Sequence, residues 1–141
     1  MIIEREIHNE LLAMSGHYPV VTITGPRQSG KTTLARTTFP NKPYFNFENP
    51  DTRQQVELDP RAFLQANQDG MIIDEFQRYP EILSYIQGLV DSKRTMGRFI
   101  LTGSNQLSML SSVSQSLAGR TSLLKLLPFT ISEANKFDSE V

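Results

Sequence analysis

The sequence contains no cysteine, which excludes disulfide bonds and metal sites built from thiolates. It also has almost no net charge, because 14 basic and 15 acidic side chains give a formal charge of −1. The two kinds of charge are interspersed along the chain. This balance does not indicate a nucleic-acid partner, although a local basic patch is compatible with it. A chain without cysteine is compatible with a reducing compartment, and we expect a cytoplasmic protein.

Long apolar runs are absent as well. Five ionisable side chains interrupt the opening segment before any apolar core of signal-peptide length, namely Glu4, Arg5, Glu6, His8 and Glu10. No stretch is long enough to span a bilayer, so the sequence predicts no membrane partner. The 141 residues fit one domain with an adequate core and are too few for two full domains.

What the sequence does contain is an alternation of apolar strands and helical segments. Ile3, Ile7 and Leu11 recur every four residues and predict a first helix ended by Gly16. Five apolar or β-branched runs predict strands, at 19–25, 42–48, 70–75, 98–104 and 121–129. This alternation predicts an α/β fold, with a parallel sheet covered by helices on both faces.

The segments between these strands differ in how clearly they predict helices. Residues 30–39 have the length of a helix, and residues 80–90 predict an amphipathic helix with Pro80 in its first turn. The polar segment 49–67 is interrupted by prolines and predicts short helices. Residues 104–120 are rich in serine, and we expect a loop there.

The densest chemistry lies in residues 25–33, which read GPRQSGKTT. They match G-x-x-x-x-G-K-[ST] directly after a predicted strand and at the start of a predicted helix. Gly25 and Gly30 would let backbone N–H groups turn toward phosphate oxygens, where the positive end of the helix dipole adds to the field. An ordinary glycine turn before a helix is the alternative. The expected nucleotide-binding residues are Gly25, Pro26, Arg27, Gln28, Ser29, Gly30, Lys31, Thr32 and Thr33.

Two side chains of this segment have specific expected roles. Lys31 would reach the β- and γ-phosphates as a mobile positive charge. The Thr32 hydroxyl would coordinate Mg²⁺. The sequence therefore predicts ATP or ADP with Mg²⁺ as the bound ligand.

Residues 71–77 read MIIDEFQ, an apolar run that ends in two adjacent acids. Adjacent residues on a strand point to opposite faces, so Asp74 and Glu75 are expected to have different roles. Asp74 would face the phosphate site and hold Mg²⁺ through water, whereas Glu75 would act on the attacking water as a general base. The alternative is a strand end with two solvated acids.

Two further candidates follow the fourth predicted strand. Ser104 is the first choice for a contact near the γ-phosphate, ahead of Thr102 and Asn105, and an ordinary Gly-Ser turn is the alternative. Arg120 precedes the fifth predicted strand, where it could supply positive charge to the site of its own or a neighbouring subunit. A solvated surface arginine is an equally good explanation of Arg120.

Five segments together resemble one family: VVTITGPRQSGKTTL, MIIDEFQRYPEIL, FILTGSNQLSML, SLAGR and LLPFTISE. In order and spacing they are similar to prokaryotic AAA-type ATPases that usually carry a C-terminal domain related to restriction-nuclease folds. The resemblance covers nearly the whole chain. It implies a three-layer P-loop NTPase domain with a five-stranded parallel sheet of order 5-1-4-3-2, ATP as the nucleotide and Glu75 as the catalytic acid.

Members of that family continue beyond the equivalent of residues 127–137 into a helical lid and the C-terminal domain. We therefore expect residues 1–141 to be an ATP-binding domain truncated before those parts, with slow turnover on its own. The leading expected function is hydrolysis of ATP to drive a conformational change in an attached domain or partner protein. A nucleotide-gated binding module with little turnover is the main alternative. A small-molecule kinase is disfavoured, because Glu75 suits activation of water.

Overall fold

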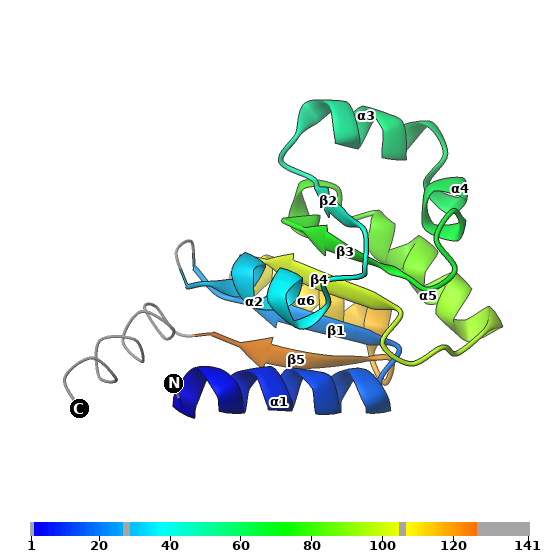
Figure 1. Cartoon of the computed structure of the whole chain (residues 1–141). Coiled ribbons are helices and arrows are strands. Elements are labelled where there is room, and N and C mark those ends of the chain that lie inside the picture. The colour runs from blue at the N-terminus through cyan, green and yellow to red at the C-terminus, as the bar shows by residue number, and fades with distance from the viewer. Residues whose placement is uncertain (1, 27–28, 105–106, 127–141) are drawn as a thin grey trace.

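The computed structural model describes residues 2–26, 29–104 and 107–126 (Figure 1). Five parallel strands form one sheet in the order β2-β3-β4-β1-β5. Read from the opposite side, this is the order 5-1-4-3-2, so the predicted α/β class and strand order are confirmed. The strands are β1 (Val20–Thr24), β2 (Tyr44–Asn46), β3 (Met71–Asp74), β4 (Phe99–Gly103) and β5 (Thr121–Lys125).

Helices cover both faces of the sheet and create two apolar clusters (Figure 1). The helices are α1 (Ile2–His17), α2 (Lys31–Thr38), α3 (Pro50–Leu58), α4 (Pro60–Gln65), α5 (Ile82–Ser92) and α6 (Leu107–Leu117), with a 3-10 turn η1 (Phe76–Arg78). Side chains of α1 and α2 pack on one face, and those of α3 to α6 pack on the other. No helix in the described ranges has the length and apolar character needed to cross a membrane.

Helix starts agree with local capping chemistry. Asn49 accepts a hydrogen bond from the backbone N–H of Asp51 at 2.9 Å, and Asp59 accepts one from Ala62 at 3.1 Å. Each of these caps is followed by a proline at the first helical position, where a missing N–H costs nothing. The short helices expected in segment 49–67 are therefore present as α3 and α4.

The structure corrects the sequence predictions at three helices. Residues 107–117 form α6 instead of a loop, because Leu110, Val113 and Leu117 pack against the core at helical spacing. Helix α1 continues through Gly16 to His17, and α5 begins at Ile82, so Pro80 lies before it and not in its first turn.

A parallel sheet places all strand ends of one kind on the same side of the molecule. We call the side where Thr24, Asp74 and Gly103 end their strands the carboxyl end of the sheet. The side where Val20, Phe99 and Thr121 begin their strands is the amino end. Segments far apart in sequence meet at each end, and the predicted phosphate loop follows β1 at the carboxyl end.

Candidate functional site

The N-terminal end of α2 has the features of an anion-binding site. Gly30 occupies the N-cap position with φ 87°, a left-handed conformation that glycine adopts without strain. Among the described residues no side chain caps this helix, and no acid lies in its first turn, so its first N–H groups and the positive end of its dipole could meet an anion. Gly25 has no room for a side chain, since a Cβ there would lie 3.0 Å from the carbonyl oxygen of Leu126.

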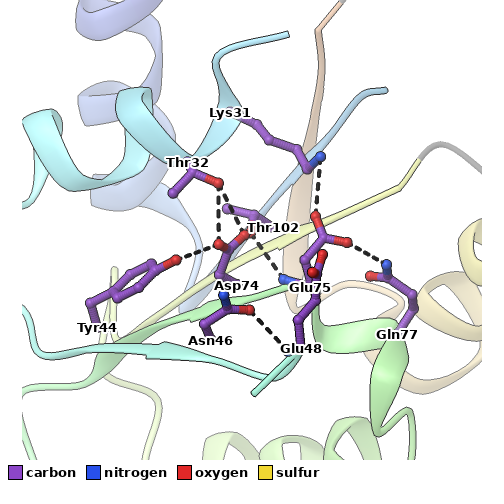
Figure 2. A network of polar contacts seen from close by, with 9 residues as sticks. All are labelled: Lys31, Thr32, Tyr44, Asn46, Glu48, Asp74, Glu75, Gln77 and Thr102. Atoms are coloured by element: carbon purple, nitrogen blue, oxygen red, sulfur yellow. Dashed lines mark hydrogen bonds and ion pairs between the residues drawn. The ribbon is translucent and has the colours of Figure 1, made fainter. Parts of the chain in front are cut away.

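Lys31 and Glu75 form a buried ion pair in front of this helix (Figure 2). The Lys31 Nζ lies 3.2 Å from the Glu75 Oε1, and the two side chains are 6% and 12% exposed. On the other carboxylate oxygen, Glu75 Oε2 accepts a hydrogen bond of 2.6 Å from the Gln77 amide. Both oxygens of Glu75 are therefore held, and the carboxylate points toward the lysine of the phosphate loop.

The backbone of Glu75 explains why its side chain leaves the line of the strand. Strand β3 ends at Asp74, and Glu75 has φ 56° and ψ 50° as the residue before η1. Among the described residues other than glycine, Glu75 alone has a positive φ. The different directions of Asp74 and Glu75 thus come from this left-handed turn and not from strand alternation.

Asp74 lies at the centre of a set of hydroxyl groups (Figure 2). Thr32 Oγ1 lies 3.1 and 3.2 Å from its two oxygens, and the Tyr44 hydroxyl donates to Oδ2 at 2.5 Å. Thr102 Oγ1 donates to Oδ1 and also accepts the backbone N–H of Glu75 at 3.3 Å. These bonds join β2, β3, β4 and α2 at one carboxylate.

Tyr44 is held in its protonated form by this environment. Burial, and then its hydrogen bond to Asp74, raise the pKa of the Tyr44 phenol well above its usual value. The Arg36 guanidinium lies over the Tyr44 ring, 4.4 Å from the ring centroid. Tyr44 therefore acts as a hydrogen-bond donor to Asp74 at every pH at which the protein would normally work.

A cavity of about 360 Å³ opens between these groups, with Gly30, Lys31, Thr32, Thr33, Glu48, Asp74 and Glu75 around it. The described residues of this lining include one cation and three carboxylates, so a metal cation would reduce the repulsion between these carboxylates and a polyanion. Thr32 and Asp74 offer hard oxygen ligands close together, which suits Mg²⁺.

Comparison with known proteins agrees with this arrangement. Residues 17–135 match a family described as AAA domain. The chain belongs to the AAA domain family. Two curated mycobacterial relatives are each 37% identical over 134 residues, namely the uncharacterized proteins Rv2008c of Mycobacterium tuberculosis and Mb2031c of Mycobacterium bovis. The alignments cover 93% of this AAA domain chain but only 30% of the relatives' length.

Solved structures of low sequence identity share the fold. The Walker-type ATPase PABY2304 of Pyrococcus abyssi superposes with a TM-score of 0.63 at 18% identity, over 94% of this chain and 56% of its own. A signal transduction ATPase with numerous domains, PH0952 of Pyrococcus horikoshii, gives 0.53 at 19% identity, over 84% and 22%. The AAA domain described here therefore has the three-layer architecture of P-loop ATPases.

The structure brings most of the predicted site residues together. Gly30, Lys31, Thr32 and Thr33 line the cavity with Asp74 and Glu75. Pro26 and Ser29 lie in the loop that leads to it, and the hydroxyl of Ser29 is buried without a hydrogen-bond partner. Arg27 and Gln28 lie outside the described residues, as does Asn105.

Ser104 and Thr102 occupy different positions around the same strand end. The Ser104 Oγ is buried at the end of β4 and has no partner among the described groups. Thr102, which ranked behind Ser104 as a candidate from the sequence, is the one bonded to Asp74. The order between them as a contact for phosphate stays a prediction.

Arg120 does not reach this site within its own chain. It precedes β5 at the amino end of the sheet, where its Nε lies 2.6 Å from Asp91 Oδ1. Its carbonyl accepts the N–H of Val20, the first residue of β1, whereas the phosphate loop follows the last. The expected contribution of Arg120 to its own site is therefore wrong, and a role in a neighbouring subunit stays a prediction.

Three residues of the site were not predicted from the sequence, namely Tyr44, Glu48 and Gln77. Tyr44 and Glu48 come from β2 and the residues just after it, and their approach depends on the pairing of β2 with β3. Gln77 follows Glu75 by two residues, and the short segment DEFQ contained the only signal for it. A positive φ at Glu75 was needed to turn that segment back on itself.

Proposed function

We propose that this AAA domain binds ATP or ADP with Mg²⁺ and hydrolyses ATP at the carboxyl end of its sheet. One observation carries the proposal: Asp74 is held beside Thr32 by hydroxyl groups, while the next residue, Glu75, is turned to the lysine of the phosphate loop. Thr32 and Asp74 would hold Mg²⁺, which supplies positive charge to the phosphates when bound. One acid that holds the metal ion and a second acid that acts on the attacking water are the groups needed to hydrolyse a phosphoanhydride.

The other proposed steps, phosphate binding and activation of water, would be carried out by side chains and backbone groups of this chain. Lys31 would exchange its contact with Glu75 for the phosphate oxygens, because a polyphosphate is the stronger anion. Released from Lys31, Glu75 would accept a proton from the attacking water while Gln77 keeps the carboxylate in place. The N–H groups at the start of α2 would bind phosphate oxygens and exclude bulk water from them.

We further propose that hydrolysis drives a conformational change in an attached domain or a protein partner, in the cytoplasm. Two comparisons support this coupling. The chain spans only 30% of the length of its curated relatives, and PH0952 is a signal transduction ATPase with a tetratricopeptide repeat sensor. A nucleotide-gated binding module with little turnover is the second candidate, and the buried pair of Lys31 with Glu75 favours it because the expected base is occupied.

Paired substitutions at the two acids test the proposal. Glu75→Gln keeps the shape and the contact with Gln77 but loses basicity, so phosphate release should fall by about 10² or more. Its ATP affinity should be equal or higher, because Lys31 loses a competing anion. Asp74→Asn should instead weaken the dependence of ATP binding on Mg²⁺.

Calorimetric titration with ATP, with and without Mg²⁺, and steady-state phosphate release together measure both effects. Asp91→Asn at the amino end serves as a control carboxylate. The same binding defect and the same residual rate in both site variants would contradict the division of roles. ATP binding without release above background in the wild type would favour the binding module.

A further inference from the structure

A second polar cavity lies at the opposite end of the sheet from the phosphate loop. It has a volume of about 350 Å³ and lies between the end of α4, the end of α5 and the residue before β4. Arg98 and Lys93 contribute two positive charges to its lining, and no acidic side chain contributes to it. From this lining we propose that the cavity is a binding site for the phosphate group of a small organic phosphate, independent of the ATP site.

Arg98 is the strongest evidence for a missing ligand. The residue is only 7% exposed, and its Nε is buried without a hydrogen-bond partner. Within the part of the chain that the structure describes, its guanidinium forms no hydrogen bond or ion pair, and its Cζ lies over the Phe99 ring in a cation–π contact, 5.1 Å from the ring centroid. A buried N–H donor without an acceptor is costly, so proteins normally supply a carboxylate, a carbonyl, an ordered water or a bound anion.

The position of Arg98 is fixed by the backbone. Its carbonyl accepts the N–H of Met71 at 3.0 Å, where β3 begins. Gly70 makes this approach possible with φ 97°, since a Cβ there would lie 1.6 Å from the Arg98 carbonyl oxygen. Burial lowers the pKa of the Arg98 guanidinium, and no neighbouring acid opposes that effect. Arg98 is thus held in place with its charge uncompensated.

The C-terminal ends of α4 and α5 carry partial negative charges that would repel an anion at this cavity. These partial charges must be compared with the positive charges of the lining. Each helix C-terminus contributes at most about half a negative charge, and α4 has only 6 residues. Arg98 and Lys93 together contribute two full positive charges. Lys93 also has no ion pair among the described residues, so the net field at the cavity favours an anion.

The neutral groups of the lining favour a phosphate over a carboxylate. Ser92 and Thr95 offer hydroxyl groups, and Gln65 and Gln68 offer amides. An arginine fork, a lysine charge and several neutral donors match a group with three or more accepting oxygens. A carboxylate has two oxygens and a single charge, and it would leave several of these donors without a partner.

An adjoining cavity provides room for the organic part of the ligand. Its volume is about 470 Å³, and it shares Gln65, Leu89 and Ser92 with the first cavity. Tyr85 lines it, and Gly88 leaves open space where a larger residue would protrude. A planar ring attached to the phosphate could therefore rest against Tyr85 along the groove between α4 and α5.

Thermal unfolding with inorganic phosphate as the probe tests the site directly. In buffer of constant ionic strength, phosphate at ten times its dissociation constant should raise the Tm of the wild type by about 3 to 6 °C. The rise should persist in Lys31→Ala, which alters the other phosphate site, and should disappear when Arg98→Met is added to Lys31→Ala. Without phosphate, Arg98→Met should melt at the wild-type temperature or above, because it removes an uncompensated buried charge and keeps the apolar stem.

Arg94→Met is the matched control, since Arg94 is exposed and its guanidinium donates to the Gly119 carbonyl at 3.1 Å. It should keep the full response to phosphate. An equal rise in Lys31→Ala with and without Arg98→Met, or no rise in Lys31→Ala, would overturn the proposal. Stabilisation by succinate but not by phosphate would overturn the assignment to a phosphate.

Calorimetry with phenyl phosphate tests the adjoining groove. Phenyl phosphate should bind the wild type about 5-fold or more tightly than inorganic phosphate, because a ring stacked on an aromatic side chain contributes a gain of this size. The gain should be lost in Tyr85→Leu while inorganic phosphate binding is kept. Equal affinity of both probes for the wild type would contradict the placement of the organic part.

Discussion

At the carboxyl end of the sheet, Lys31, Asp74 and Glu75 already have ion-pair or hydrogen-bond partners, whereas at the amino end Arg98 lines a cavity and has no acceptor among the described residues. Lys31 is paired with Glu75, and Asp74 accepts from three hydroxyl groups. A ligand at the carboxyl end must therefore exchange contacts, while a ligand at the amino end would add them. Such an exchange of contacts would cost affinity, but it would hold each proposed catalytic group in position before a nucleotide binds.

Among the substitutions that remove contacts at the carboxyl end, we expect the largest effect, a loss of ATP affinity, at Lys31. Lys31→Ala removes the ammonium that would meet the phosphates and leaves Glu75 buried without its ion pair. We expect ATP affinity to fall by about 10²-fold or more, as for other buried charged contacts. Isothermal calorimetry measures this directly, with Arg94→Ala as a control for overall charge. Unchanged affinity in Lys31→Ala would mean that segment 25–33 is a structural turn.

A smaller effect is expected at Gln77, which holds the other side of Glu75. Gln77→Leu removes the amide that donates to Glu75 Oε2 at 2.6 Å, and kcat should fall by about 10-fold because the general base is less well oriented. ATP affinity should not change. Steady-state phosphate release and calorimetry separate the two, with Gln87→Leu on α5 as the matched control. An equal loss of affinity and rate would assign Gln77 to nucleotide binding.

Tyr44, at the carboxyl end of the sheet, is expected to make the stability of the folded protein depend on pH. Its raised pKa means that the folded state keeps the phenol proton when the unfolded state loses it, at about pH 10. This contribution is complete below pH 10 and is lost as the pH rises further. Between pH 9 and 11 the Tm should therefore fall more in the wild type than in Tyr44→Phe. Tyr18→Phe, at an exposed position, should fall like the wild type, and parallel profiles for all three would refute the link.

The smallest effect is expected at Arg120. Because this arginine is paired with Asp91 at the amino end, Arg120→Ala should leave the rate of phosphate release within about twofold of the wild type. The measurement should be repeated over a range of protein concentrations. A loss of rate in Arg120→Ala that grows with concentration would show that the arginine acts in the site of a neighbouring subunit.

Much of the carboxyl end could be predicted because its signals are local. The spacing of Gly25, Gly30 and Lys31 defines a loop within nine residues, and an apolar run ending in an acid marks the neighbouring strand. The order of the strands came from a family resemblance, since no local pattern specifies which strands pair. The short helices of segment 49–67 were likewise expected, because Pro50 and Pro60 are a local signal for where helices can begin.

The parts that could not be predicted depend on tertiary contacts. Residues 107–117 contain many serines, whose helix propensity is modest, and burial of three apolar side chains decided in favour of a helix. Tyr44 reaches Asp74 only because β2 pairs with β3. The position of Arg120 follows from the direction of β5, which places residues before a parallel strand far from those after it.

The left-handed backbone of Glu75 has an evolutionary consequence. A glycine would adopt φ 56° without the penalty that a side chain brings, so Glu75→Gly would offset part of its own loss of contacts by up to about 1 kcal/mol. The substitution would still leave Lys31 buried without its ion pair in the nucleotide-free protein, so the relief of strain would not cover the whole loss. On the proposed role of Glu75, a bound nucleotide would give Lys31 a new partner, and a descendant that kept the fold and the nucleotide but lost turnover would lie one mutation away. Retention of an acid at this strained position in a lineage would then be a record of selection for hydrolysis.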